Sequence, residues 1–511
     1  MKMHPTGRWL WTAAALLAGL VLRLWFIGHF ARIAGDTLVY GEIAKNWMQY
    51  GVYGFVDIGG APQPTLIRLP GYPLFLIACF RIFGVEQYTA VMDLQAIIDL
   101  LSCILISALA GRLFGDRARM AALWLSALCP FTASYVAAPL TETLTLNCIV
   151  VTFYALQRWQ QARSGFNRWL WVVIAALAYA ILLRPEQGLL AAAVIPSMLW
   201  IAVSASGCPL FTAPSSQQAG VPGEQSCLIE RKSGVFAPRA ICPHSTRHRL
   251  RATLPVLVAA LLTLLPLLPW TIRNERTFHV FQPLAPRKAV DPGEFVPLGF
   301  QRWFRTWAID FAATDDVYWN YDGTPIKISD LPTRAFDTEV QYSRTGALLN
   351  DYNETSNATP ALDIRFAALA HERICANPAR YYIALPIARL IDMALRPRVE
   401  MFSTPLAWWK YHEDPPQTIF AAAYAALNLA YFVLAAQGIV LWRRRHWTGN
   451  TPLAWAMLSS ILLRSALLLT LDNAEPRYTL EFFPILFFLA SIPFTRFNRT
   501  TSSPKAANPI S

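Results

Sequence analysis

Long apolar runs separated by short polar connections dominate the hydrophobic pattern of this chain. Ten of the runs have about the length that a helix needs to cross a bilayer, roughly 17–25 residues. They lie at about 9–27, 88–111, 119–138, 142–158, 168–184, 188–205, 252–270, 418–441, 452–471 and 479–495. Because backbone groups inside lipid must be hydrogen-bonded within the segment, the pattern predicts an all-α polytopic membrane protein.

Arginines gather in the connections on one side of this predicted bundle. With ten alternating spans, the arginines at 112–119, 158–168 and 443–445 fall on one face, together with the basic residues of both terminal segments. Short loops rich in Lys and Arg mark the cytoplasmic side. We therefore expect both termini inside, and we expect the run at 9–27 to be an uncleaved span because it is long for a signal peptide.

Three longer segments interrupt the spans and set the expected organisation. We expect a transmembrane module at 1–205 with a first external loop at 28–87, a polar and disordered cytoplasmic linker at 206–251, one span at 252–270, an external region at 271–417, and C-terminal helices with a cytoplasmic tail at 418–511. Within the external region, the short apolar stretch 380–395 is predicted to be an interfacial or re-entrant helix. The stretch 68–84, which contains prolines and Arg81, is predicted to lie along the outer surface.

Composition agrees with a membrane protein and argues against nucleic acid as a partner. Only 15% of the residues are charged and 55% are hydrophobic, whereas soluble proteins carry about 25% charged residues. The net charge of +12 comes mainly from the short connections, and no aromatic-interleaved basic patch accompanies it. Four of the eight cysteines lie in apolar stretches, so the sequence shows no disulfide framework.

The stretch "GDTLVYGEIAKNW", residues 35–47, follows the first predicted span. Its apolar residues, from Val39 to Trp47, recur at helical spacing, whereas Lys45, Asn46 and Gln49 fall on the other face, which predicts an amphipathic interfacial helix. Asp36 stands at the expected N-cap, where a carboxylate accepts from free backbone amides. Asp36 is thus either a cap or a catalytic group at the membrane face, and the two roles are compatible.

Acidic, arginine and tyrosine residues recur at the predicted outer ends of separate spans. The candidate substrate-binding residues are Tyr40, Arg68, Tyr72, Glu142, Arg184, Glu186, Arg273, Glu475, Arg477 and Tyr478. Each arginine alone is explained by contact with lipid headgroups. Together they favour one polar cavity that opens outward, with acids for proton transfer and arginines for an anion such as phosphate.

Two other classes of function share this hydropathy. A transporter or lipid flippase would carry ionisable residues in the middle of its spans, whereas the charges identified here stand at the outer ends. A non-enzymatic scaffold would use 271–417 as a binding domain, but it leaves the recurring acids and arginines without a role.

The order of "GDTLVYGEIAKNWMQYGVYG", "RLPGYPLFLIACFRIFG", "TET", "RPE", "PWTIRNERTF" and "EPRYTLEFFP" resembles the GT-C superfamily of membrane glycosyltransferases. The chain is most similar to bacterial relatives of protein O-mannosyltransferases and of the aminoarabinose transferase that modifies lipid A. The resemblance covers roughly 1–205, 252–300 and 370–495. It implies a GT-C-like helix bundle in the bacterial inner membrane, acting on the cell envelope from its external face.

The resemblance also implies roles for particular residues. The donor would be a sugar on a polyprenyl phosphate, the acceptor a lipid, a glycan or a protein, and Asp36 the catalytic acid or base in the first external loop. Arg68, Arg184 and Arg477 match arginines that hold the lipid phosphate. Thr37 stands where many relatives have a second acid, so no metal-ligating residue is assigned, although some relatives bind a divalent metal.

Overall fold

The computed structural model describes residues 5–162, 164–205, 244–402, 404–409, 414–444 and 450–495. The fold is helical apart from one short β-hairpin, as the apolar runs predict. Most of the linker predicted at 206–251 lies outside the described residues. Its last part is helical, because α10 begins at His244.

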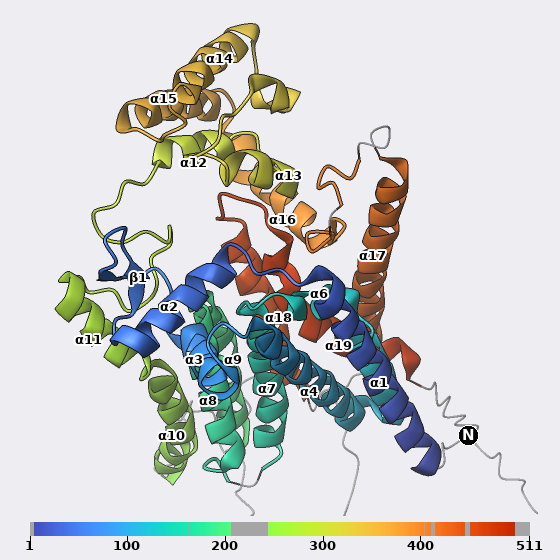
Figure 1. Ribbon diagram of the computed structural model, residues 1–511. Helices are drawn as coiled ribbons and strands as arrows, with labels where there is room; N and C mark the ends of the chain where they lie inside the picture. Colours follow the sequence, from blue (N-terminus) through green and yellow to red (C-terminus); the bar gives the residue numbers. More distant parts are fainter. Residues whose placement is uncertain are drawn as a thin grey trace, which may run out of the picture.

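Helices form a bundle at each place where the sequence predicts a span (Figure 1). Their bounds are α1 Pro5–Phe30, α4 Tyr88–Phe114, α5 Asp116–Ala127, α6 Pro130–Ser134, α7 Glu142–Gln160, α8 Arg168–Leu183, α9 Gly188–Ala205, α10 His244–Leu264, α11 Leu267–Phe278, α17 Pro415–Arg444, α18 Thr451–Leu468 and α19 Phe483–Ala490. The largest apolar core of the described residues lies between these helices.

Seven of the described helices are long and apolar enough to cross a membrane, and an eighth span arises if the bent pair α5 and α6 is counted as one. The sequence-based prediction of about ten spans therefore exceeds the seven or eight described spans that are long and apolar enough. Helix α8 is too short at 16 residues, and α7 carries polar residues at both ends, from Glu142 to Gln160. Both pack together inside the bundle, where neighbouring helices shield them from lipid.

One ion pair contradicts the expectation that charges avoid the middle of the spans. Arg23 of α1 is fully buried and donates from Nε to Asp99 of α4 at 2.8 Å. Its guanidinium also donates to the carbonyl oxygens of Gly19 and Ala127. Neither charged side chain lines the cavities described below, so the pair joins helices rather than marking a transport path.

The segment after α1 folds against the end of the bundle as two helices and a hairpin. It comprises α2 Asp36–Tyr50, β1 Gly54–Val56, β2 Pro62–Pro64 and α3 Gly71–Phe83. The predicted amphipathic helix is present as α2, and it buries Tyr40, Ile43 and Ala44. Asn46, predicted on the polar face, is also buried, because its amide donates to the carbonyl oxygen of Gly54 at 3.0 Å.

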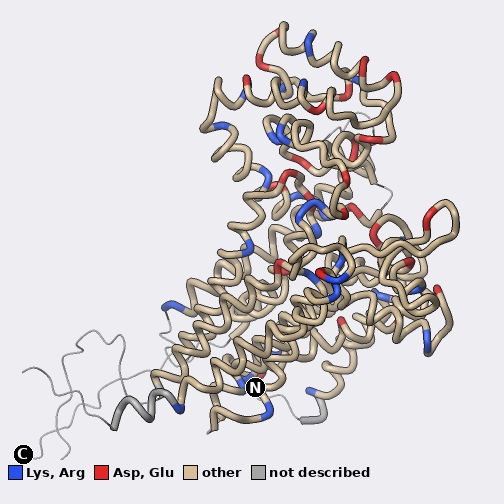
Figure 2. The backbone as a smooth tube through the Cα atoms, turned by 90° about the vertical axis from the view of Figure 1, so that its left-hand side faces the viewer, with Lys and Arg blue, Asp and Glu red and all other residues tan. Residues whose placement is uncertain are grey.

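A second helical unit stands at one end of the bundle (Figure 1). It contains α12 Leu298–Arg305, α13 Phe311–Ala313, α14 Glu339–Asn353 and α15 Pro360–Ala376, and it has an aromatic core of its own that includes Trp303 and Trp307. Helix α16 Leu385–Leu395 follows it and lies in the stretch predicted to be interfacial. Figure 2 shows charged residues concentrated in this unit and at its junction with the bundle, whereas the opposite half of the bundle is mostly uncharged.

Candidate active site

Two arginines from distant parts of the chain hold the carboxylate of Asp36. Arg68 donates from Nη2 to Oδ1 at 2.7 Å, and Arg477 lies 3.0 Å from Oδ2. The predicted N-cap role is wrong: Asp36 is the first residue of α2, Gly35 is the cap with a positive φ of 54°, and no side chain caps the helix. The carboxylate turns to the guanidiniums because each offers a charge-assisted bond, which is stronger than a bond to a backbone amide.

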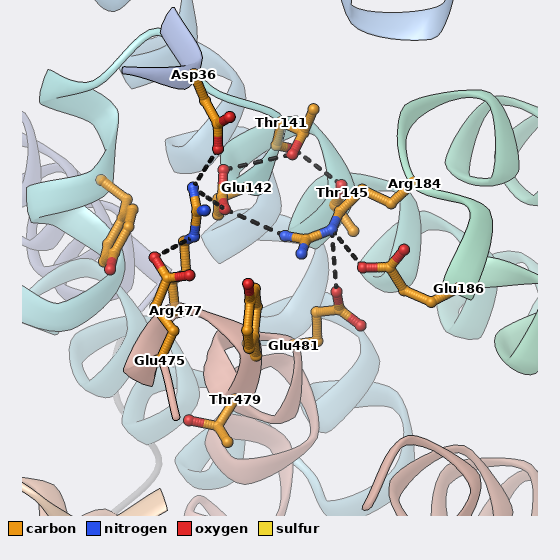
Figure 3. A network of polar contacts seen from close by, with 12 residues as sticks. Asp36, Thr141, Glu142, Thr145, Arg184, Glu186, Glu475, Arg477, Thr479 and Glu481 are labelled. Carbon is orange, nitrogen blue, oxygen red and sulfur yellow. Dashed lines mark hydrogen bonds and ion pairs between the residues drawn. The ribbon is translucent and has the colours of Figure 1, made fainter. Parts of the chain in front are cut away.

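The ion pairs continue from Arg477 to Arg184 through Glu142 (Figure 3). Glu142 lies 3.1 Å from Arg184 and 3.8 Å from Arg477, and its side chain is almost fully buried. Arg184 also contacts Glu186 at 2.8 Å, and Arg477 contacts Glu475. The structure thus brings together seven of the charged residues that the sequence singles out, from Asp36 to Arg477.

Arg464 and Glu481 complete this network, although neither is among the site residues predicted from the sequence. Arg464 lies 3.0 Å from Glu481 and 3.4 Å from Glu186, and Glu481 lies 3.8 Å from Arg184. A signal was present in the sequence, since each is a lone ionisable residue inside an apolar run, and such residues in a membrane helix tend to be paired.

Helix ends set the charges of the site. Asp36 and Glu142 open α2 and α7, where the positive end of the helix dipole stabilises a carboxylate. Arg184 follows the last residue of α8, at the negative end of that helix dipole. Burial opposes ionisation of Asp36, but Arg477 and Arg68 outweigh it and lower its pKa to about 2. Burial raises the pKa of Glu475 above its ordinary value.

The three candidate tyrosines differ in their position. Tyr40 borders the site, with the guanidinium of Arg68 over its ring at 5.7 Å. Tyr478 lies between Arg184 and Arg477, at 5.9 and 5.7 Å from their guanidinium carbons. Tyr72 is fully buried, donates to the Gln95 side chain at 2.9 Å and packs against Tyr40, so it supports the site without lining it.

Arg273 lies apart from the network, which differs from the predicted single cluster. Its guanidinium donates to the carbonyl oxygens of Thr65 and Tyr53, at 2.8 and 3.0 Å. The rings of Trp270 and Phe278 also pack against it. Arg273 therefore fixes the hairpin to α11, and it also donates to Oδ1 of Asn274 at 3.0 Å.

Two cavities meet at Asp36. The larger, of about 640 Å³, is called the basic cavity because its charged lining consists of five arginines and three acids: Arg68, Arg184, Arg287, Arg464, Arg477, Asp36, Glu142 and Glu186. The smaller, of about 300 Å³, is called the acidic cavity because its charged lining consists of three acids and two arginines: Asp36, Glu400, Glu475, Arg32 and Arg477. Asp36, Arg477 and Leu140 line both cavities, so the Asp36–Arg477 ion pair forms part of the wall between them.

These residues do not fit a divalent-metal site. Among the described residues, no group of three His, Cys, Asp or Glu side chains has an arrangement that could hold a metal ion. The carboxylates of Asp36 and Glu142 face guanidiniums, which take the place that a cation would occupy. The cysteines among the described residues are free and form no disulfide.

A bundle of membrane-length helices around a buried acid–arginine network defines a polytopic membrane protein with an internal polar site. Residues 63–208 match the family described as dolichyl-phosphate-mannose-protein mannosyltransferase. The match covers less than a third of the chain and includes Arg68, Glu142, Arg184 and Glu186.

Solved structures give a weaker comparison. Two crystal structures of ArnT from Cupriavidus metallidurans are similar to this chain. The structure bound to undecaprenyl phosphate has 16% identity and a TM-score of 0.36, over 90% of this chain and 76% of ArnT. The apo structure has 15% identity and a TM-score of 0.34, over 95% and 76%. No curated protein sequence matches the chain.

Proposed function

We propose that the chain transfers a sugar from a polyprenyl-phosphate donor to a lipid, glycan or protein acceptor, with Asp36 as the general base. The observation that carries the proposal is the position of Asp36. Its carboxylate lies where the two cavities join and is held by Arg68 and Arg477, which also line the basic cavity. A base at such a junction can reach an acceptor in one cavity and a donor in the other.

The basic cavity suits a lipid phosphate. Five guanidiniums against three carboxylates give it a positive balance, and a guanidinium fork matches the geometry of phosphate oxygens. Leucines from several elements form much of the apolar part of the same wall: Leu69, Leu140, Leu183, Leu189, Leu284, Leu467 and Leu471. A cavity that is both cationic and apolar supports a donor with a phosphate headgroup and a hydrocarbon chain.

The transfer step balances with these residues alone. An acceptor hydroxyl attacks the anomeric carbon, a new C–O bond forms, and the proton passes to Asp36. The bond from that carbon to the phosphate oxygen breaks, and the lipid phosphate leaves with the electron pair. Arg68, Arg184 and Arg477 stabilise the charge that develops on it, and such electrostatic stabilisation contributes several kcal/mol, about 3–4 for one donor group in a known case. No step uses a metal.

The low pKa of Asp36 fits a base that is activated by the donor. At a pKa of about 2 the carboxylate is a weak base in the empty site, whereas general bases work best when their pKa is near the working pH. A donor phosphate that engages Arg68 and Arg477 brings negative charge next to Asp36 and competes for its hydrogen bonds. Both effects raise the pKa of a carboxylate.

We place the reaction on the external face of the bacterial inner membrane. The arginine distribution assigns all five residues to the outside: Asp36 and Arg68 belong to the first external loop, and Glu142, Arg184 and Arg477 lie at the outer ends of predicted spans. The charged unit in Figure 2 belongs to residues 271–417, which the same distribution assigns to the outside. A polyprenyl-phosphate donor would then present its sugar in the outer leaflet.

The experiment is transfer from a polyprenyl-phosphate sugar by purified protein in lipid nanodiscs. Asp36→Asn removes the basic oxygen but keeps the size of the side chain, so transfer should fall by about 10²–10⁴-fold, the usual contribution of a general base. The matched control is Asp93→Asn, because Asp93 is exposed on α4; this variant should keep wild-type turnover. If Asp36→Asn also keeps it, the base must be Glu142 or Glu186 and the proposal is wrong.

A further inference from the structure

Three residues that line the acidic cavity each carry a buried side-chain oxygen atom without a hydrogen-bond partner in the protein. They are Oε2 of Glu400, Oε2 of Glu475 and Oγ1 of Thr37. These three residues line the cavity and are 8%, 5% and 1% exposed. A buried polar atom without a partner costs about 1–3 kcal/mol, so three at one cavity favour a ligand that supplies the missing bonds.

Most of these free atoms can only accept hydrogen bonds. An ionised carboxylate has no donor, and a hydroxyl both donates and accepts. The other oxygen of Glu400 accepts from the Tyr135 hydroxyl at 2.8 Å, which fixes the carboxylate in place. Ligand groups that complement such a site are hydroxyl or ammonium donors. An anionic ligand is disfavoured, because the three carboxylates of this cavity outnumber its two guanidiniums.

Aromatic side chains form another part of the cavity wall. Trp319 is 42% exposed, lines the cavity and packs edge-on against Phe311 at 5.3 Å between ring centroids. A flat exposed indole beside hydrogen-bond acceptors suits a ligand with one apolar face and several polar edges. Sugar rings have this character.

We infer that the acidic cavity binds the acceptor, and that the group it takes is a hydroxyl-rich sugar without negative charge. This inference rests on the proposed function, because it assigns to the second cavity the substrate that Asp36 deprotonates. The contrast between the cavities supports the division: the arginine-rich one takes the anionic donor, and the carboxyl-rich one takes the acceptor. Asp36 and Arg477 lie between the two substrates.

The test uses two soluble probes, methyl glucoside and its 6-phosphate, with protein in nanodiscs. We expect methyl glucoside to bind without donor and to accept sugar in its presence, with a kcat/KM at least tenfold above that of the phosphate. Glu400→Gln replaces an acceptor oxygen by an NH₂ donor at nearly unchanged volume. It should raise the dissociation constant and KM for methyl glucoside at least fivefold and leave the KM for the donor unchanged.

Two further variants complete the test, one as a second probe of the cavity and one as a negative control. Thr37→Val removes a hydroxyl at constant shape and should also weaken methyl glucoside binding, which covers the case in which Glu400→Gln fails to fold. Glu339→Gln, at an exposed position of α14, should change nothing. Absence of methyl glucoside binding, preference for the phosphate, or intact acceptor KM in folded Glu400→Gln and Thr37→Val proteins would each overturn the inference.

The outcomes separate the inference from the proposed function. If transfer occurs but the acidic-cavity variants change only the donor KM, the glycosyltransferase proposal stands and the acceptor site is elsewhere. If methyl glucoside binds in a Glu400-dependent way but no variant or wild-type protein transfers sugar, the site binds glycans and the proposed reaction fails.

Discussion

At the scale of single residues, the stability of the site depends on how its charges compensate one another. Arg184 contacts Glu142, Glu186 and Glu481, and Arg477 contacts Asp36, Glu475 and Glu142. Removing one member of a buried ion pair leaves the other uncompensated, at a cost of about 3–5 kcal/mol. Most charges of the network have two or three partners, so the remaining partners partly compensate when one charged side chain is removed.

The pH dependence of transfer tests the position of Asp36 between two arginines. A base acts when deprotonated, so activity falls as pH drops through its pKa. In the free enzyme this pKa is about 2, and kcat/KM should therefore stay flat down to the pH at which the protein unfolds. The acid limb of kcat reports the donor-bound enzyme, and we expect it at higher pH.

Arg68→Gln should move the acid limb of kcat upward by about one pH unit or more, because a nearby arginine lowers the pKa of an aspartate by about 1–3 units. Arg68→Lys keeps the positive charge and should shift the limb less. Equal acid limbs in wild-type protein and both variants would show that Asp36 is not the titrating base.

At the scale of elements, the contact between α3 and α8 brings two arginines of the site together. A Cβ atom on Gly71 would lie 2.5 Å from the carbonyl of Leu182 and 2.7 Å from the nitrogen of Leu183, so only glycine allows this approach. Arg68 precedes α3 by three residues, and Arg184 directly follows α8. The spacing of the two helices therefore sets the spacing of two guanidiniums in the basic cavity.

Gly71→Ala should push α3 away from α8, lower the melting temperature, and raise the KM for the donor. Overpacking of this kind costs about 1–3 kcal/mol. The control is Gly28→Ala in α1, where a Cβ meets no atom within 4 Å and where alanine favours the helix. Thermal melts in detergent and donor titrations measure both effects; an unchanged donor KM in Gly71→Ala would show that this contact does not position the arginines.

The sequence predicts elements better than it predicts partners. The length of apolar runs located the helices, and charges at span ends located most of the network, because both signals are local. The pairing of Arg464 with Glu481 and Glu186 and the backbone contacts of Arg273 depend on packing between elements far apart in the chain. Likewise, Asp36 is not a cap, because Arg68 and Arg477 reach it from 32 and 441 positions away.

At the scale of the whole molecule, the orientation of the bundle is the prediction with the widest consequences. Residues 28–87 and 271–417 should be external, and both termini and 206–251 cytoplasmic. The variant Lys327→Cys introduces a cysteine at an exposed position near Asp322. In a Cys375→Ser background, it should react with a membrane-impermeant thiol reagent in intact cells.

The native cysteines of the linker provide the internal control. Cys208, Cys227 and Cys242 belong to 206–251 and should react only after permeabilisation, as measured by mass spectrometry of the labelled peptides. If position 327 is labelled only after permeabilisation, the orientation is the reverse of the predicted one. The basis for a donor presented in the outer leaflet is then removed.

The buried pair of Arg23 and Asp99 also has a consequence for biogenesis. The two residues are 76 positions apart in the chain, and synthesis at roughly 5–20 residues per second separates their appearance by about 4–15 s. During this interval Arg23 lacks its acid, at a cost of about 2.5–3.5 kcal/mol for an arginine in the centre of a membrane helix. Helix α1 therefore gains its full stability in lipid only once α4 has been made, and a nascent chain that stops before Asp99 exposes an unmatched charge that membrane quality control can detect.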